Sequence, residues 1–105
     1  DPTMKEFMAF MKKYVPDASP EDANTTYGYA VAQLMVHVLK QAGDNLTREN
    51  IMKVVSNIKN HQIPMAIPGV LANTAPDDFA LFQMMQLIKF DGKTWVPYGE
   101  PMAVK

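Results

Sequence analysis

Apolar residues near the start of the chain recur at intervals of three and four, which is the spacing of one helix face. The pattern covers residues 3–14, with apolar side chains at Met4, Phe7, Met8, Met11 and Tyr14. Thr3 and Glu6 have the spacing of a capping box at its start. Because the residue before a proline avoids helical angles, we expect the helix to end before Pro16.

The longest helical pattern in the chain ends at Gly43, a residue type that commonly follows the last helical turn. Its wide apolar stripe consists of Tyr27, Val31, Leu34, Met35, Val38 and Leu39. Its start is less sharply defined. Ser19-Pro20-Glu21-Asp22 can form the cap, with proline at the first helical position, and Asn24, Thr25 and Thr26 are later candidates.

A third helix is predicted from Thr47, which is placed to cap it. Leu46 can pack against Ile51 as a hydrophobic staple. The expected buried face consists of Ile51, Val54, Val55 and Ile58, and Asn60-His61 is the expected end.

The remainder of the chain has strand and turn patterns. Residues 63–71 hold two prolines, which lack the amide hydrogen of a central strand, so an extended or edge segment is expected. Residues 73–78 are dense in turn formers and mark the only plausible subdomain boundary. Residues 82–90 and 94–96 then flank Asp91-Gly92, a strong hairpin signal, and Pro97 weakens any continuation. Because two strands are not stable alone in water, the hairpin is expected to join a larger sheet.

Composition narrows the class of protein. The 105 residues are enough for one domain at most, and 48% apolar and 20% charged residues are globular values. A net charge of −1 gives no basic field for nucleic acid, so no nucleic-acid partner is expected. The absence of cysteine excludes disulfides and zinc-thiolate sites. The chain opens Asp1-Pro2 with no leader, and we expect it to begin partway through a longer protein.

No constellation of side chains predicts catalysis, a cofactor or a metal. Nine methionines raise the possibility of a copper(I) site, but aromatic residues alternate with them and core packing is the favoured interpretation. His37 and His61 have no partner at metal-ligand spacing and are interpreted as ordinary surface residues. Asp77 and Asp78 are adjacent, so turn formation or capping is favoured over paired catalysis. We therefore expect a protein that is not an enzyme.

Polar and aromatic residues gather where the long helix starts: Asn24, Thr25, Thr26, Tyr27 and Tyr29. Free amides at a helix start, together with hydroxyls and an aromatic ring, can hold a carboxylate. Capping and core packing explain the same residues without a ligand. Residues 24–26 and 45–47 also match the glycosylation pattern, and capping is again the favoured explanation.

Several stretches, taken in order, resemble the C-terminal part of a type I periplasmic substrate-binding protein of the branched-chain amino acid (Leu/Ile/Val-type) ABC transporter family. They are Tyr27–Leu34, Leu46–Lys53, Ile67–Val70 and Phe90–Pro97. The ordered set carries the resemblance, and no single stretch is diagnostic.

The resemblance implies an α/β fold: a fragment of a two-lobed protein with about three helices, an extended proline-rich segment and a C-terminal β-hairpin. Residues 1–72 would form the C-terminal section of the first lobe. Residues 73–105 would form a crossover and the hairpin that completes the second lobe.

In such a protein a small solute, here an amino acid or related carboxylate, binds between lobes that close around it and is delivered to a membrane permease. The resemblance places a cleft-facing residue near Asn24, and the ligand-binding candidates are Asn24, Thr25 and Tyr27. Some members of that family have a large apolar residue at this position. The polar residues of this chain differ from them and favour a more polar ligand or an aromatic acid. The implied location is the periplasm, or the cell surface by a lipid anchor in a Gram-positive host.

Two further expectations follow from the fragment interpretation. The chain alone should not bind the solute, because most of the cleft lies outside it, and its exposed hairpin should promote oligomers. The alternative is a ligand-sensing domain of a receptor or regulator with the same fold.

Overall fold

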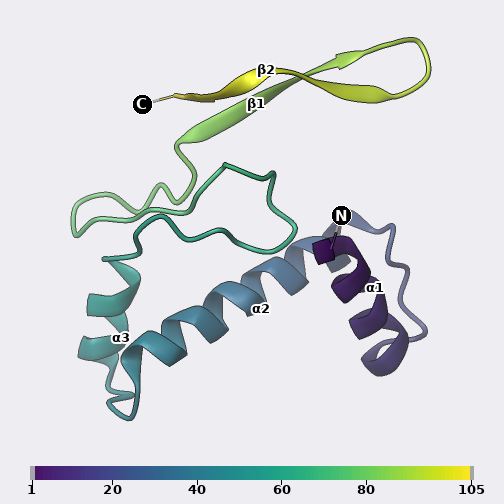
Figure 1. Cartoon of the computed structure of the whole chain (residues 1–105). Helices are drawn as coiled ribbons and strands as arrows, with labels where there is room; N and C mark the ends of the chain where they lie inside the picture. The colour runs from purple at the N-terminus through teal and green to yellow at the C-terminus, as the bar shows by residue number, and fades with distance from the viewer. Residues whose placement is uncertain (1, 105) are drawn as a thin grey trace.

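The computed structural model describes residues 2–104 and contains three helices followed by an antiparallel strand pair (Figure 1). The helices are α1 (Pro2–Tyr14), α2 (Ala23–Ala42) and α3 (Arg48–Val55), and the strands are β1 (Met84–Phe90) and β2 (Trp95–Ala103). The chain therefore has the mixed helix and strand content expected from the sequence. No helix within the described residues combines the length and apolar character needed to cross a bilayer.

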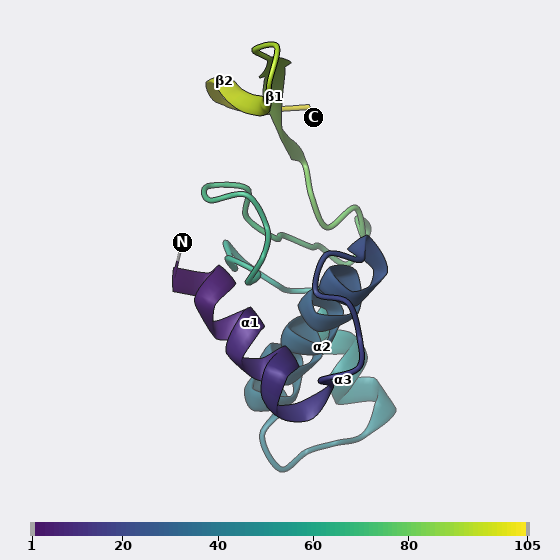
Figure 2. The same ribbon diagram turned by 90° about the vertical axis from the view of Figure 1, so that its right-hand side faces the viewer.

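The elements are spread out in space. The long α2 lies at the centre with α1 and α3 near its opposite ends, and the hairpin projects from the other side of the loop region (Figures 1 and 2). The radius of gyration is 16.0 Å, against about 13 Å for a typical 100-residue domain. The larger radius agrees with the separation of the hairpin from the helices in Figures 1 and 2.

The first helix confirms the predicted element and is held by two side chains. Phe7 is fully buried and Met11 nearly so, whereas the other apolar residues of the predicted stripe are exposed. The Phe7 ring packs edge-on against Tyr29 of α2, with ring centroids 5.1 Å apart, and Phe10 contacts the same tyrosine. One aromatic cluster thus attaches α1 to α2.

The start of α2 differs from the cap with Pro20 at the first helical position. Asp22 is the N-cap, with extended backbone angles, and its carboxylate accepts a hydrogen bond from the amide of Asn24. An aspartate can satisfy a free amide of the first turn, which explains why the helix begins here. Gly43 ends α2 as predicted, at a positive φ of 62° that glycine adopts without strain.

The third helix begins as predicted and ends early. The Thr47 hydroxyl accepts a hydrogen bond from the amide of Asn50 and confirms the cap. The helix stops at Val55, so Ile58 is buried as expected but lies beyond it, and the predicted end at residues 60–61 is wrong. Leu46 is 62% exposed, which leaves little burial for the expected staple.

A small core forms where α2 and α3 meet the loops that follow. Its buried residues are Val38, Ile58, Ile63 and Ala72. Residues 62–71 contain no strand, and their ends are joined by an isolated antiparallel bridge between His61 and Ala72. A second bridge links Ala72 to Phe82, so residues on both sides of the 73–78 turn contribute to this core.

The hairpin has the predicted turn and a longer second strand than predicted. The Asp91 carboxylate accepts hydrogen bonds from the amides of Lys93 and Thr94, and Gly92 adopts a positive φ of 98°. Contrary to the expected weakening, β2 continues through Pro97, which pairs with Ile88. A two-stranded sheet has only edge strands, and edge strands tolerate proline.

Both faces of the hairpin are apolar and exposed. Because paired residues share a face, Ile88, Phe90 and Trp95 lie on one side and Leu87 and Tyr98 lie on the other. All five are exposed, and Trp95 is 64% exposed. Such a pattern is typical of a sheet covered on both sides.

Candidate functional site

The predicted ligand residues lie in the first turns of α2, at its exposed end. Asn24 and Tyr27 are exposed, with Tyr27 at 72%, and Thr25 is half-buried. The side chains of these three residues make no hydrogen bond to another residue within 2–104. Asn24 and Tyr27 are therefore accessible, and Thr25 is partly so.

Asp22 and Tyr29, which lie beside these residues in the sequence, have structural roles. The Asp22 carboxylate accepts a hydrogen bond from the Asn24 amide at 2.8 Å, so this part of the helix start already binds an anion from the chain itself. Tyr29 is half-buried against Phe7 and Phe10 in the aromatic cluster. Of the polar and aromatic group at this helix start, Tyr29 therefore belongs to the packing between α1 and α2.

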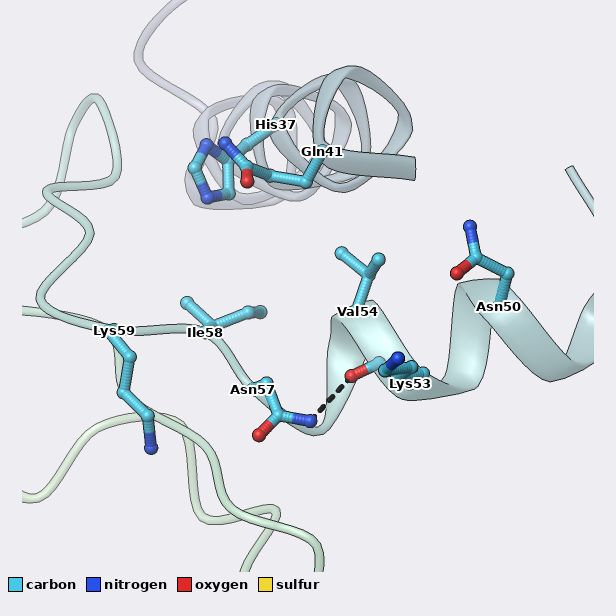
Figure 3. A pocket seen from close by; sticks show the side chains of 8 residues that line it. All are labelled: His37, Gln41, Asn50, Lys53, Val54, Asn57, Ile58 and Lys59. Carbon is cyan, nitrogen blue, oxygen red and sulfur yellow. Dashed lines mark hydrogen bonds between the residues drawn. The ribbon is translucent and has the colours of Figure 1, made fainter. Parts of the chain in front are cut away.

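A groove of about 610 Å³ lies at the other end of α2, between that helix and α3. Figure 3 shows Val54 and Ile58 pointing toward His37 and Gln41 from the opposite wall. Polar and apolar side chains from α2, α3 and the loop after α3 line it: His37, Gln41, Asn50, Lys53, Val54, Asn57, Ile58 and Lys59. The lining contains no carboxylate.

Most polar groups of the groove hold the backbone around α3. The Asn50 amide donates to the carbonyl oxygens of Ala42 and Asn45, at 3.3 and 2.8 Å. The Asn57 amide donates to the carbonyl oxygen of Lys53 at 2.7 Å, as the dashed line in Figure 3 marks. The Lys59 ammonium donates to the Thr74 carbonyl oxygen. These bonds satisfy carbonyls at helix ends and in the adjoining loop.

The structure corrects the interpretation of the two histidines as ordinary surface residues. His37 from α2 and His61 from the loop after α3 are both half-buried, and their rings stack with centroids 3.7 Å apart and planes inclined by 17°. Burial lowers the pKa of His61 from its ordinary value, and the charge of His37 lowers it further. No spacing rule joins residues so far apart in sequence, so only the tertiary fold reveals the pair.

The remaining candidate groups have local roles. Asp78 accepts hydrogen bonds from the Ala80 amide at 2.9 Å and from the Gln83 side chain at 2.7 Å, as expected of a turn residue. Met8 and Met11 line a smaller groove of about 210 Å³ beside the end of α1. Within residues 2–104, no three or more His, Asp or Glu side chains gather as metal ligands would.

Comparisons with protein-family models, with curated proteins and with solved structures gave no match to this chain.

Proposed function

We propose that this chain is part of the solute-binding component of an ABC importer. In this proposal it belongs to a two-lobed type I periplasmic substrate-binding protein in the periplasm or anchored at the cell surface. The solute is a branched-chain amino acid or a related small carboxylate, including aromatic acids. The bound form is delivered to a membrane permease.

The observation that supports this proposal best is the hairpin with two apolar faces. A strand pair that exposes Leu87, Ile88, Phe90, Trp95 and Tyr98 leaves large apolar surface in water. Addition to an α/β sheet that is covered on both faces removes that surface from water on both sides. The ordered resemblance of residues 27–97 assigns the hairpin to such a sheet in the second lobe.

The α2 helix gives a second, independent reason. Its side facing the loops is covered, since Val38 is buried and Leu34 packs against the core. Val31, Met35 and Leu39 of the predicted apolar stripe are exposed. A helix that packs on the sheet of a lobe would cover these residues as well, as an amphipathic stripe requires.

In the proposed site, Asn24, Thr25 and Tyr27 form part of one wall of the cleft. Their side chains are accessible and without hydrogen-bond partners in the described chain, so they remain available to a ligand. An amide, a hydroxyl and a phenol offer donors and acceptors beside an aromatic ring. This combination suits a carboxylate ligand with an aromatic or polar side chain.

The test is calorimetric titration of the complete product of the encoding gene with leucine, valine, phenylalanine and aromatic carboxylates. We expect saturable binding of at least one of these, and no binding by the 105-residue chain alone. Tyr27→Ala should weaken binding at least tenfold, whereas Tyr14→Ala, which removes another exposed helical tyrosine, should leave it unchanged. Stoichiometric binding by the 105-residue chain alone would contradict the proposal.

A further inference from the structure

The two histidines connect α2 to the loop region at one point. His61 follows Asn60, which adopts a positive φ of 47° and donates its amide hydrogen to the Asn73 side chain at 2.9 Å. The His61 amide donates to the Ala72 carbonyl oxygen at 3.1 Å, and the Ala72 amide donates back at 2.8 Å. The ring of His61 then stacks on His37. The stack therefore joins α2 to the bridge that closes the 62–71 loop.

The two stacked histidines adjoin buried residues of the core. His37 precedes Val38, and the bridge partner Ala72 is fully buried in the same cluster. The loop between the bridged residues supplies Ile63, which is also buried there. Separation of the two rings would therefore loosen the edge of the core where the loop meets α2.

The charged side chains that line the groove with His37 are cations, and cations do not stabilise a protonated imidazole. On α2 the only other charged side chain is Lys40, and residues 62–83 carry two, Asp77 and Asp78 in the 73–78 turn. The Asp78 carboxylate accepts hydrogen bonds from the Ala80 amide and the Gln83 side chain. Lys53 of α3 and Lys59 of the following loop line the groove beside His37, and both are cations. The only carboxylate on α3 is Glu49, which is exposed in its first turn and does not line the groove.

We propose that His37 and His61 form a pH-sensitive latch that holds the 62–71 loop against α2 while the rings are neutral and loosens in acid. Two protonated imidazoles at 3.7 Å repel each other, and the neighbouring lysines add to this repulsion. Histidine is the side chain whose charge changes in the range where such a switch operates. This latch does not depend on the proposed transport function.

The direction of the pH dependence follows from the linkage between proton binding and opening of the latch. The folded chain holds His61 at a pKa below its ordinary value of 6.5. Protons therefore bind more tightly when the latch is open, and acid favours the open form. The contact has full strength above pH 6.5 and weakens as the pH falls from there through the lowered pKa. Each unit of difference between the two pKa values multiplies the opening equilibrium by up to about tenfold.

Hydrogen exchange of the Ala72 amide measures the latch directly, because this amide donates across the bridge to His61. We expect its protection factor, corrected for intrinsic exchange, to fall several-fold between pH 7.5 and pH 5.0. The Gly43 amide, which donates to the Leu39 carbonyl oxygen at the C-terminal end of α2 and takes no part in the bridge, serves as the internal reference. In His61→Phe, which keeps an aromatic ring without the charge, the fall should disappear. An equal fall in this variant, or no fall in the wild-type chain, would overturn the proposal.

Side-chain NMR titration supplies a readout that does not require this variant to fold. The chain has two histidines, so their resonances can be assigned with one substitution. The His61 midpoint should lie below that of the urea-unfolded chain, and His37→Phe should raise it. A His61 midpoint equal to or above the unfolded value would refute the latch.

Discussion

The Thr74 hydroxyl makes two hydrogen bonds inside the protein, and its removal is the sharpest test of how the loop region is held. Thr74 is 6% exposed. Its oxygen accepts from the Ile58 amide at 2.9 Å, and its hydrogen is donated to the carbonyl oxygen of Val55, the last residue of α3. One side chain thus satisfies both the carbonyl at the end of α3 and the Ile58 amide in the loop that follows.

Thr74→Val keeps the shape of the side chain and removes only the hydroxyl. The buried Ile58 amide and the part-buried Val55 carbonyl then lose their partner, and each such loss costs about 1–3 kcal/mol. The expected decrease in the free energy of unfolding is therefore about 2–6 kcal/mol. Thr74→Ser keeps both bonds and loses one methyl group, which costs about 0.8 kcal/mol.

Urea unfolding monitored by circular dichroism measures the three chains under one set of conditions. The free energy of unfolding should decrease in the order wild type, Thr74→Ser, Thr74→Val, with the larger step between the two variants. In thermal unfolding, each kcal/mol lowers the midpoint by roughly 4–8 °C for a domain of about this size. If Thr74→Val is as stable as Thr74→Ser, the hydrogen bonds of Thr74 do not hold the loop region.

Three other perturbations probe the helix start and the hairpin. Asp22→Ala removes the cap of α2 and should lower the free energy of unfolding by about 1 kcal/mol in urea titrations, whereas Asp22→Asn should retain most of it. The exposed hairpin should cause the chain to self-associate in sedimentation velocity at high concentration, and Leu87→Lys with Trp95→Lys should return it to a monomer. Hydrogen bonds from the Thr94 and Lys93 amides lower the pKa of Asp91. The turn is therefore stable above pH 3.8 and should lose its amide protection as the pH falls through the lowered pKa, a loss that Asp91→Asn should remove.

Local pattern predicted the elements well because the signals act over a few residues. Thr47 and Gly43 are placed by their own chemistry as a cap and a stop, and Asp91-Gly92 sets a turn by the same kind of local bonding. The errors arose where neighbours in space decide the outcome. The sequence did not specify that α3 would end at Val55 or that β2 would continue through Pro97.

Part of the candidate site could be predicted from the sequence, and part of it could not. Asn24, Thr25 and Tyr27 could be proposed from sequence because a helix start has recognisable polar residues, and the structure places them on one accessible turn. The groove between α2 and α3 has no sequence signature, because its lining comes from three separate segments.

The sequence alone determined that the chain forms three helices and a hairpin, because spacing, caps and turns act between residues that are close along the chain. Only the tertiary structure decided which apolar residues are covered. It buries Phe7, Val38 and Ile58, and it leaves the hairpin apolar on both exposed faces. It also brought His37 against His61. Such contacts depend on how separate elements pack, and periodicity within one element does not contain that information.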